Sequence, residues 1–288
     1  MPALIDLRKR IRSVRNTQQI TKAMKTVSTA KFKKAQRVVL EGRPYSHSFS
    51  DILEHIAVWA EYYSHPLFEK REEQRVQALV ITSDKGLCGA FNSNLLQKAL
   101  SFFTEKAGSS ELRLVLVGKK AFSFFKRHPF PVEMTYTDKM DKLTFGDIQK
   151  ISRHMMHKFV FQETDAVYIA FNEFKSILSP KTRLVRLLPI VSPPVDEGQW
   201  LWAPTWEPEA LRILNYLLPL YVDLQVYHYF RESQAAEHAA RMMAMDNATN
   251  NAEELIEDLT LILNKIRQAS ITKELLEIMT AVEALAKK

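Results

Sequence analysis

Apolar residues recur every three or four positions near both ends of the 288-residue chain, a spacing typical of amphipathic helices. In residues 1–60, the apolar positions at this spacing are Leu4, Leu7, Ile11 and Val14, followed after a shift by Ile20, Met24 and Val27. Neither glycine nor proline interrupts residues 3–41 or residues 220–288. Each end is therefore expected to form a long helix whose apolar seam needs a partner helix.

The C-terminal helix is predicted within residues 207–288 and has the clearer seam. Its apolar positions are Leu255, Leu259, Ile262, Ile266 and Ala269, then Leu275, Ile278, Val282 and Leu285. Charge favours pairing of the two ends, since residues 1–43 contain twelve basic and two acidic residues, whereas residues 231–288 contain seven basic and ten acidic ones. We expect the two terminal helices to pack against each other.

The middle of the chain, residues 75–195, has a different pattern. Short apolar runs rich in β-branched residues predict buried strands at 76–84, 112–118 and 165–171, with helices between them at 92–106, 121–126 and 145–161. A further run at 182–191 predicts an edge strand, because Pro189 cannot donate a ladder hydrogen bond. The alternation predicts a single βαβ-type domain, followed by a connecting loop at 192–208.

Composition narrows the classes of protein further. The chain is 46% hydrophobic and 25% charged, which excludes a disordered protein, and its single cysteine excludes an intramolecular disulfide. The start, MPALIDLRKR, lacks the apolar stretch of a signal peptide, so we expect an unprocessed protein in a reducing compartment. The longest apolar stretch, Leu211 to Phe230, contains charged residues and is not expected to span a membrane.

Cys88 is the one candidate nucleophile. It lies in SDKGLCGAFN between a predicted strand and a helix, and a G-x-C-x-G turn presents the nucleophile of some cysteine amidohydrolases. No histidine occurs in a local setting that would identify a base, so the alternative is a small buried cysteine at a tight turn. The same loop matches neither phosphate-binding glycine motif, and no nucleotide cofactor is expected.

Two further clusters suggest metal or nucleic-acid chemistry, and both have simpler explanations. His154 and His157 lack a third ligand, and the acidic residues at 253–258 flank the helical seam as solvated charges. The basic N-terminal helix could bind nucleic acid, yet Phe32 is the only aromatic residue before Tyr45. An acidic protein partner is the favoured explanation, and a basic coiled-coil nucleic-acid-binding protein is the alternative.

Three stretches of the sequence resemble the γ-subunit family of F-type ATP synthases. They are IRSVRNTQQITKAMKTVSTAKFKKAQ at residues 11–36, ITSDKGLCGAFN at 81–92, and the segment at 237–285 that begins EHAARMMAMDNATNNAEEL. Ala90 and Thr280 to Val282 depart from the family pattern. The cysteine-containing insertion of the chloroplast form is absent.

The resemblance implies an α/β fold class in which a long antiparallel coiled coil of the N-terminal and C-terminal helices carries an inserted Rossmann-like α/β domain. It implies a rotating central shaft inside a ring of three α and three β subunits, with a foot that meets the ε subunit and the membrane c-ring. Such a shaft couples ion flow to ATP synthesis or hydrolysis, with no catalytic site, cofactor or nucleic-acid partner of its own. It would be peripheral, on the cytoplasmic face of the bacterial plasma membrane, and attached through the c-ring.

The resemblance also assigns partner contacts to particular residues. It places Met24, with Lys22 and Lys25 beside it, near acidic loops of the β subunits. It matches Arg267 and Gln268 to positions that hydrogen-bond a β-subunit loop. From the residues alone, Met24 would be a seam methionine, and the other pair would be part of an exposed helix face.

Overall fold

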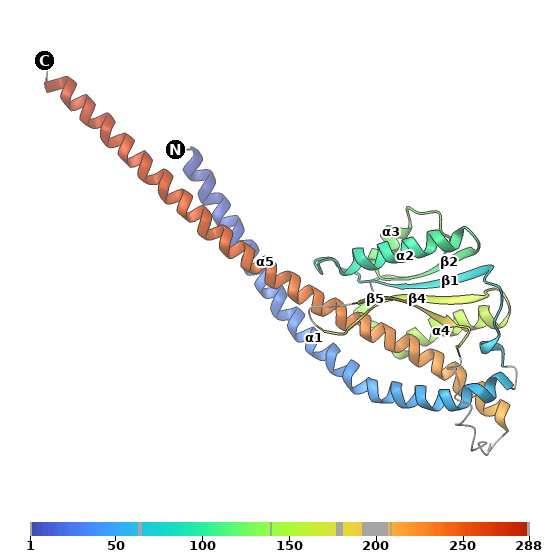
Figure 1. Cartoon of the computed structure of the whole chain (residues 1–288). Helices are drawn as coiled ribbons and strands as arrows, with labels where there is room; N and C mark the ends of the chain where they lie inside the picture. Colours follow the sequence, from blue (N-terminus) through green and yellow to red (C-terminus); the bar gives the residue numbers. More distant parts are fainter. Residues whose placement is uncertain are drawn as a thin grey trace. The chain divides into compact units, whose positions relative to one another are not determined.

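The computed structural model describes residues 2–62, 65–138, 140–176, 181–191, 207 and 209–286. Both termini are helical, as predicted: α1 spans Pro2–Tyr62 and α5 spans Ala210–Ala286 (Figure 1). Between them lie η1 (Pro66–Phe68), β1 (Arg75–Ile81), α2 (Phe91–Ala107), β2 (Glu111–Val117), α3 (Lys119–Phe125), β3 (Val132–Tyr136), η2 (Met140–Lys142), α4 (Phe145–Val160), β4 (Ala166–Glu173) and β5 (Lys181–Leu188). The chain divides into two compact units, Met1–Ser28 with Met242–Lys288, and Thr29–Arg241.

The unit formed by Thr29–Arg241 contains a five-stranded sheet in the order β3-β2-β1-β4-β5. β1 pairs in parallel with both β2 and β4, β2 pairs in parallel with β3, and β5 runs antiparallel to β4 at the other edge. In register, Leu79 of β1 lies opposite Val115 of β2 and Ile169 of β4. The predicted Rossmann-like domain is confirmed, as is the edge strand before Pro189.

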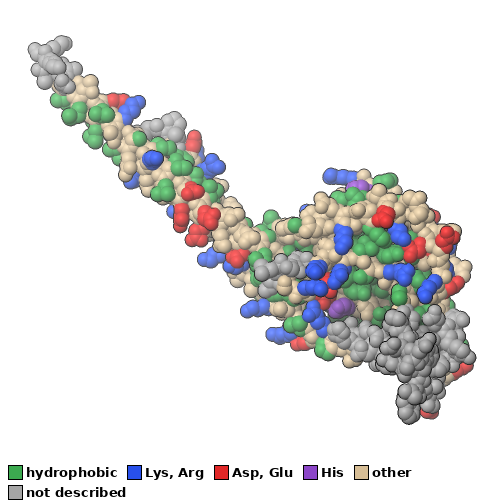
Figure 2. Space-filling view, in the orientation of Figure 1, with side chains coloured by type: hydrophobic (Ala, Val, Ile, Leu, Met, Phe, Trp, Pro, Cys, Tyr) green, Lys and Arg blue, Asp and Glu red, His purple; other side chains and the backbone are tan. Residues whose placement is uncertain are grey.

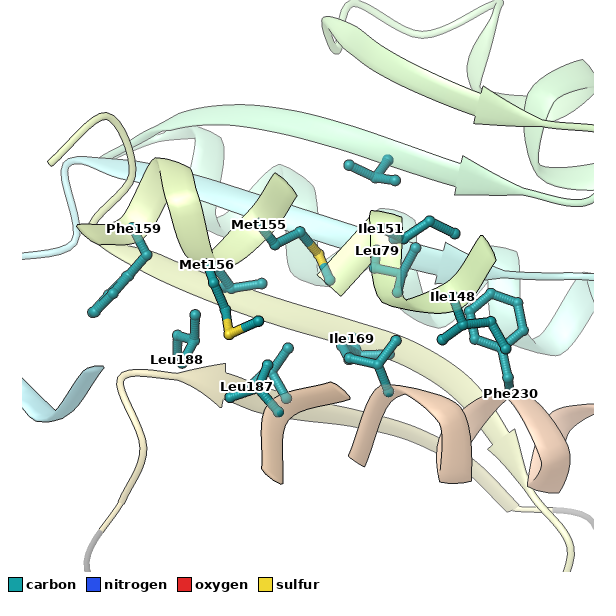
Figure 3. Close-up of a cluster of buried hydrophobic side chains, with 14 of the residues drawn as sticks. Leu79, Ile148, Ile151, Met155, Met156, Phe159, Ile169, Leu187, Leu188 and Phe230 are labelled. Atoms are coloured by element: carbon teal, nitrogen blue, oxygen red, sulfur yellow. The ribbon is translucent and has the colours of Figure 1, made fainter. Parts of the chain in front are cut away.

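Helices cover both faces of this sheet, and alternate strand residues supply the two cores (Figure 1). On one face, Val76, Ala78 and Val80 of β1 pack against α2 and α3. On the other, Leu79 and Ile81 pack against α4 and the first part of α5, where Phe230 meets Ile148 (Figure 3). Because both faces are covered, β1 is an almost continuous run of buried residues, which is why its sequence is apolar without alternation.

Some elements differ from the predictions. The short strand β3 was not predicted, because its residues are only half-buried and it follows Pro129 and Pro131. The prolines do not end the terminal helices: α1 contains Pro44 and α5 contains Pro219, and both prolines lie inside the ranges 1–60 and 207–288 predicted for these helices. The predicted connecting loop at 192–208 lies outside the described residues, apart from Glu207.

His65, directly before η1, links that segment to α5. Its Nδ1 accepts a hydrogen bond from the Leu67 backbone N–H at 3.2 Å, and its Nε2 lies 3.2 Å from the Asn215 side-chain oxygen. Because Nδ1 accepts, the ring is neutral with the proton on Nε2. Burial is the main cause that lowers the pKa of His65 below its ordinary value of 6.5.

Protonation of His65 is therefore expected to destabilise the unit. A lowered folded-state pKa means that the neutral ring stabilises the fold above pH 6.5, and that this contribution is lost as the pH falls below that value. Between pH 6.5 and pH 5.5 one such group can cost at most about 1.4 kcal/mol of unfolding free energy, so we expect a loss below about that value. Urea unfolding at pH 7.5 and pH 5.5 measures it. The difference between the two pH values should shrink in His65→Asn, and an unchanged difference would contradict this role.

In the other compact unit, the start of α1 pairs with the end of α5. Lys25 Nζ lies 2.5 Å from Asp246 Oδ1, and the Thr21 and Thr249 hydroxyl oxygens are 2.8 Å apart. The earlier residue of α1, Thr21, meets the later residue of α5, Thr249, so the two helices run antiparallel. At this register, the residues of α5 beyond about Gln268 lie past the first residues of α1.

The seam of α1 begins as predicted, with Leu4, Leu7 and Val14 half-buried and Ile11 buried, and then departs from the prediction. Ile11, Thr21 and Ser28 are buried, and the half-buried positions between them continue the same heptad without a shift. The predicted seam positions Ile20 and Val27 are wrong, since these side chains are 60% and 57% exposed. The seam here is polar and small, so its register is not visible from hydrophobicity.

The seam of α5 is also only partly as predicted. Leu259 is buried and Ile266 is half-buried, which confirms these two positions. Leu255, Ile262 and Ala269 are exposed, and the seam instead uses Ala252, Ile256 and Leu263. The predicted seam positions Leu275, Ile278 and Val282 are exposed as well, because this part of α5 extends beyond α1.

Candidate partner-binding sites

The first predicted contact surface is on α1. Met24 is half-buried at the side of the helix seam, and Lys22 is exposed. Ile20, Met24 and Val27 are spaced as one helical stripe, about a quarter turn away from the buried seam. The stripe contains exposed apolar side chains, whereas Lys22 lies on the other side of α1, because it is two residues from both Ile20 and Met24 and so about 200° around the helix from each. Ile20 and Val27 are additional candidates for partner contact at this surface.

Lys25 differs from Lys22 because it is engaged within the chain. Its ammonium pairs with Asp246, and the two side chains are 42% and 33% exposed. Lys25 was predicted to contact a β-subunit loop, but its positive charge is already partly balanced by Asp246 of α5. Lys22 is the stronger candidate for the electrostatic part of the contact.

The ion pair between Lys25 and Asp246 should contribute little to stability. At this exposure we expect Asp246→Ala to cost below about 1 kcal/mol of unfolding free energy, and less at 1 M salt. Lys273 and Glu277, an exposed pair within α5, provide the matched control through Glu277→Ala. Urea unfolding of both variants at low and high salt measures the difference. A cost above about 2 kcal/mol for Asp246→Ala would contradict this ranking.

The second predicted surface is near the end of α5. Arg267 and Gln268 are both exposed, and they directly precede an exposed apolar stripe on the same side of the helix. The stripe comprises Ile271, Leu275, Ile278 and Val282, which are 50%, 57%, 61% and 59% exposed. Figure 2 shows hydrophobic side chains on the surface along this part of the chain. An exposed apolar stripe beside an Arg–Gln pair is suited to a partner surface with a polar edge.

The two surfaces are separate sites. Arg267 lies roughly 30 Å along α5 from Asp246, which marks the level of Lys25. The structure therefore does not bring all five predicted contact residues together. Each surface is suited to its own partner segment.

A third feature is the loop between β1 and α2, which contains Cys88. Arg241 of α5 donates to the backbone oxygens of Lys85 at 3.1 Å and Gly86 at 3.3 Å, and it pairs with Glu237 at 2.7 Å. This loop follows the carboxyl end of β1, where the chain crosses to β2 on one side and β4 on the other. In open α/β sheets this position commonly binds a ligand. Here the chain's own arginine occupies it.

Comparisons with known proteins identify the family. A family model described as ATP synthase matches residues 3–285. The ATP synthase gamma chain of Pelotomaculum thermopropionicum is 44% identical over 286 residues, which are 99% of this chain and 100% of the relative. The gamma chain of Solibacter usitatus is 44% identical over 292 residues, with 99% of each chain covered. The chain belongs to the ATP synthase gamma chain family.

Solved structures agree with this membership. The central stalk of the Tetrahymena thermophila mitochondrial ATP synthase matches with a TM-score of 0.62 and 29% identity, covering 80% of this chain and 99% of that one. A chain of the Euglena gracilis mitochondrial ATP synthase matches with a TM-score of 0.70 over 99% of this chain and 95% of its own length. At 21% identity, the second match supports the fold alone. The gamma chain family thus accounts for the long terminal helices and the inserted sheet together.

Cys88 does not have the properties of a nucleophile. The side chain is 2% exposed, and burial is the main cause that raises the pKa of its thiol. Its hydrogen-bonding neighbours are the Asn92 amide at 3.1 Å and the Ser83 hydroxyl at 3.9 Å, neither of which is a base. A reactive cysteine needs a lowered pKa and access. In this gamma chain, Cys88 packs a tight turn, and the amidohydrolase alternative is not supported.

The alternatives of metal and nucleic-acid binding also lack support. In the described part of the chain, no three His, Cys, Asp or Glu side chains are grouped to hold a metal ion. Basic and acidic side chains are interspersed along the helix pair (Figure 2), and Arg43 is paired with the buried Glu232. Such mixing reduces the uniform positive field that nucleic acid requires.

One polar contact was missed by the sequence analysis. Glu232 of α5 accepts hydrogen bonds from Arg43 of α1 and from the Phe174 backbone N–H at 2.9 Å, so that one carboxylate joins both long helices to the end of β4. Phe32 of α1 packs edge-on against the Phe174 ring, with centroids 5.4 Å apart. A glutamate that is 3% exposed is costly unless paired, so this cluster joins the helices to the sheet firmly. These contacts could not be predicted from the sequence, because a single acidic residue in a helix is usually solvated and forms no recognisable pattern.

Proposed function

We propose that the chain is the rotating central shaft of a bacterial F-type ATP synthase, coupling ion flow through the membrane sector to ATP synthesis or hydrolysis on other subunits. The observation that carries this proposal is identity of 44% along the whole length of gamma chains, combined with paired terminal helices around an inserted α/β domain. Coupling of this kind requires surfaces that bias distant sites, and it requires no catalytic group in the shaft.

Three segments of the chain would form the shaft and its foot. The helices within residues 1–60 and 207–288 would form the shaft, and the α/β domain within 75–195 would form the foot. The contacts of Glu232 with Arg43 and Phe174 are suited to transmit torque, since they link both helices to the sheet. Such a connection must be rigid, because a flexible one would let the helices rotate relative to the sheet without transmitting torque.

The two exposed surfaces would face the ring of three α and three β subunits. Lys22, Met24 and Lys25 would contact acidic β-subunit loops, with Ile20 and Val27 contributing apolar area. Arg267 and Gln268 would hydrogen-bond a second β-subunit loop, and the stripe from Ile271 to Val282 would turn against an apolar lining. The ε subunit and the c-ring would bind the foot.

We place the chain at the cytoplasmic face of the bacterial plasma membrane, attached through the c-ring. Within the described ranges, no helix is both long enough and apolar enough to cross a bilayer. Membrane attachment through a partner subunit is compatible with that finding.

Co-expression with the α and β subunits of a close relative tests the proposal. We expect one complex on a sizing column that contains all three chains and hydrolyses ATP, whereas the purified chain alone hydrolyses none. Removing residues 267–288 should weaken assembly or turnover. Failure of the full chain to co-elute with either subunit would contradict the proposal.

A further inference from the structure

A groove between α1 and α5 is lined by an unusual set of side chains. Its volume is about 210 Å³, and it lies within the unit formed by Thr29–Arg241. The lining residues are Lys31, Lys34, Ala35 and Val38 of α1, and Arg231, Gln234 and His238 of α5. A single water occupies about 30 Å³ in the liquid, so the groove has room for a polyatomic ion with part of its hydration shell.

Hydrogen-bond donors dominate the polar lining. The lysine and arginine side chains are donors only, and Gln234 uses its side-chain oxygen to accept from Arg231 at 3.0 Å, which directs its amide NH₂ elsewhere. Among the described residues that line the groove, none is acidic. A site of this kind is complementary to an oxyanion rather than to a cation or an apolar ligand.

Arg231 is held in place before any ligand binds. Its guanidinium carbon lies 4.7 Å from the centre of the Tyr227 ring, and one terminal nitrogen donates to Gln234. Its Nε is buried and has no hydrogen-bond partner in the described part of the chain. This atom is inaccessible to solvent and does not open onto the groove, so the terminal guanidinium nitrogens are the Arg231 donors that a ligand in the groove would use. The planar fork of arginine is well suited to phosphate.

The two acidic residues nearest on α5 have arginine partners outside the groove. Glu232 accepts from Arg43 and the Phe174 backbone, and Glu237 is paired with Arg241. Lys34 forms no ion pair with any residue that the structure describes. The positive charge of Lys34 is therefore not cancelled by an ion pair within the described part of the chain.

We propose that this groove is a binding site for a phosphate group, held by Lys34 and Arg231 with Lys31, Gln234 and His238 around it. A phosphate bound there would contact both long helices and hold them together. Free phosphate, pyrophosphate and the phosphates of a nucleotide share this chemistry.

Calorimetric titration of the full-length chain with phosphate, pyrophosphate and ADP tests the proposal, at an ionic strength held constant with sodium chloride. We expect saturable one-to-one binding that Lys34→Gln with Arg231→Gln weakens at least tenfold. The matched control is Lys33→Gln with Arg37→Gln, which removes the same charge from exposed positions of α1 outside the groove. It should change the affinity less than twofold. Lys34→Gln alone, an exposed substitution that spares the fold, should weaken binding severalfold.

Comparing the three ligands shows whether the bound phosphate group comes from a free phosphate or from a nucleotide. Pyrophosphate binding as tightly as ADP would assign the site to free phosphates, and ADP binding more than tenfold tighter would assign it to a nucleotide. Absence of saturation, or an equal loss of affinity in the control variant, would overturn the proposal. Titration of the complex with α and β subunits is the last test: if phosphate binding disappears on assembly, an acidic partner segment fills the groove and the proposal is wrong.

Discussion

Replacing Arg267 and Gln268 together by alanine should lower ATP turnover of the assembled complex at least tenfold while leaving the chain folded. Both side chains are exposed on α5, so their removal costs the free chain little stability. If they hydrogen-bond a β-subunit loop, the loss corresponds to about 1.5–3 kcal/mol for bonds that involve a charged group. Melting curves, sizing chromatography and ATPase rates on the same preparations measure the three effects.

Two controls make this result specific. Arg267→Lys keeps the charge but loses the planar fork, so it should recover only part of the turnover. Lys273→Ala with Glu277→Ala removes an exposed ion pair farther along the same helix and should leave turnover within twofold of the unchanged chain. Normal turnover in the Arg267 and Gln268 double variant would return both residues to an ordinary exposed helix face.

Arg241→Ala should produce the largest loss of stability, about 3–5 kcal/mol. The substitution removes the donors to the Lys85 and Gly86 oxygens and leaves Glu237, only 4% exposed, without its arginine. Removing the arginine of a buried ion pair is the costly case, because the carboxylate stays buried after losing that partner. Urea unfolding of the free chain measures the loss, and faster labelling of Cys88 by a thiol reagent reports opening of the loop.

A double-mutant cycle separates the ion pair from the loop contacts. Glu237→Gln removes the buried charge, so Arg241→Ala in that background should cost markedly less than in the unchanged chain. Arg231→Ala is the matched control, because it removes another arginine of α5. It should cost less unfolding free energy than Arg241→Ala, since Arg231 has no carboxylate partner among its described contacts. A cost below about 1 kcal/mol for Arg241→Ala would show that the arginine does not hold the loop.

The sequence predicted the sheet well, because burial on both faces gives a strong local signal. β1, β2 and β4 have apolar, β-branched sequences wherever helices cover them, and their predicted positions agree with the structure within two or three residues. β3 was missed for the converse reason. It is a half-exposed edge strand, so its apolar residues are few and their pattern is weak.

The helix seams were predicted less well, for a physical reason. Hydrophobic periodicity shows that a stripe exists but not which stripe faces the partner helix. In α1, the buried heptad passes through Thr21 and Ser28, while the apolar Ile20 and Val27 face outward. In α5, the stripe from Ile271 to Val282 looks like a continued seam but has no opposing residues of α1. The outward stripes are the candidate partner surfaces.

The contacts between distant segments could not be predicted from local pattern. Arg241 reaches a loop more than a hundred residues earlier in the chain, and Glu232 joins α1 to the end of β4. Single charged residues in a helix give no periodic signal, since most of them are solvated. The contacts of Arg241 and Glu232, whose loss should lower the unfolding free energy most, could therefore be found only in the structure.

The most direct test of the central claim is to watch the chain turn. Lys126 is exposed at the end of α3, so Lys126→Cys would carry a bead while the buried Cys88 stays unlabelled. With the α and β subunits fixed to a surface, adding ATP should drive the bead in one direction, with three preferred angles per turn from the threefold ring. ATP hydrolysis at full rate with a bead that remains still, or that moves in both directions equally, would contradict the account.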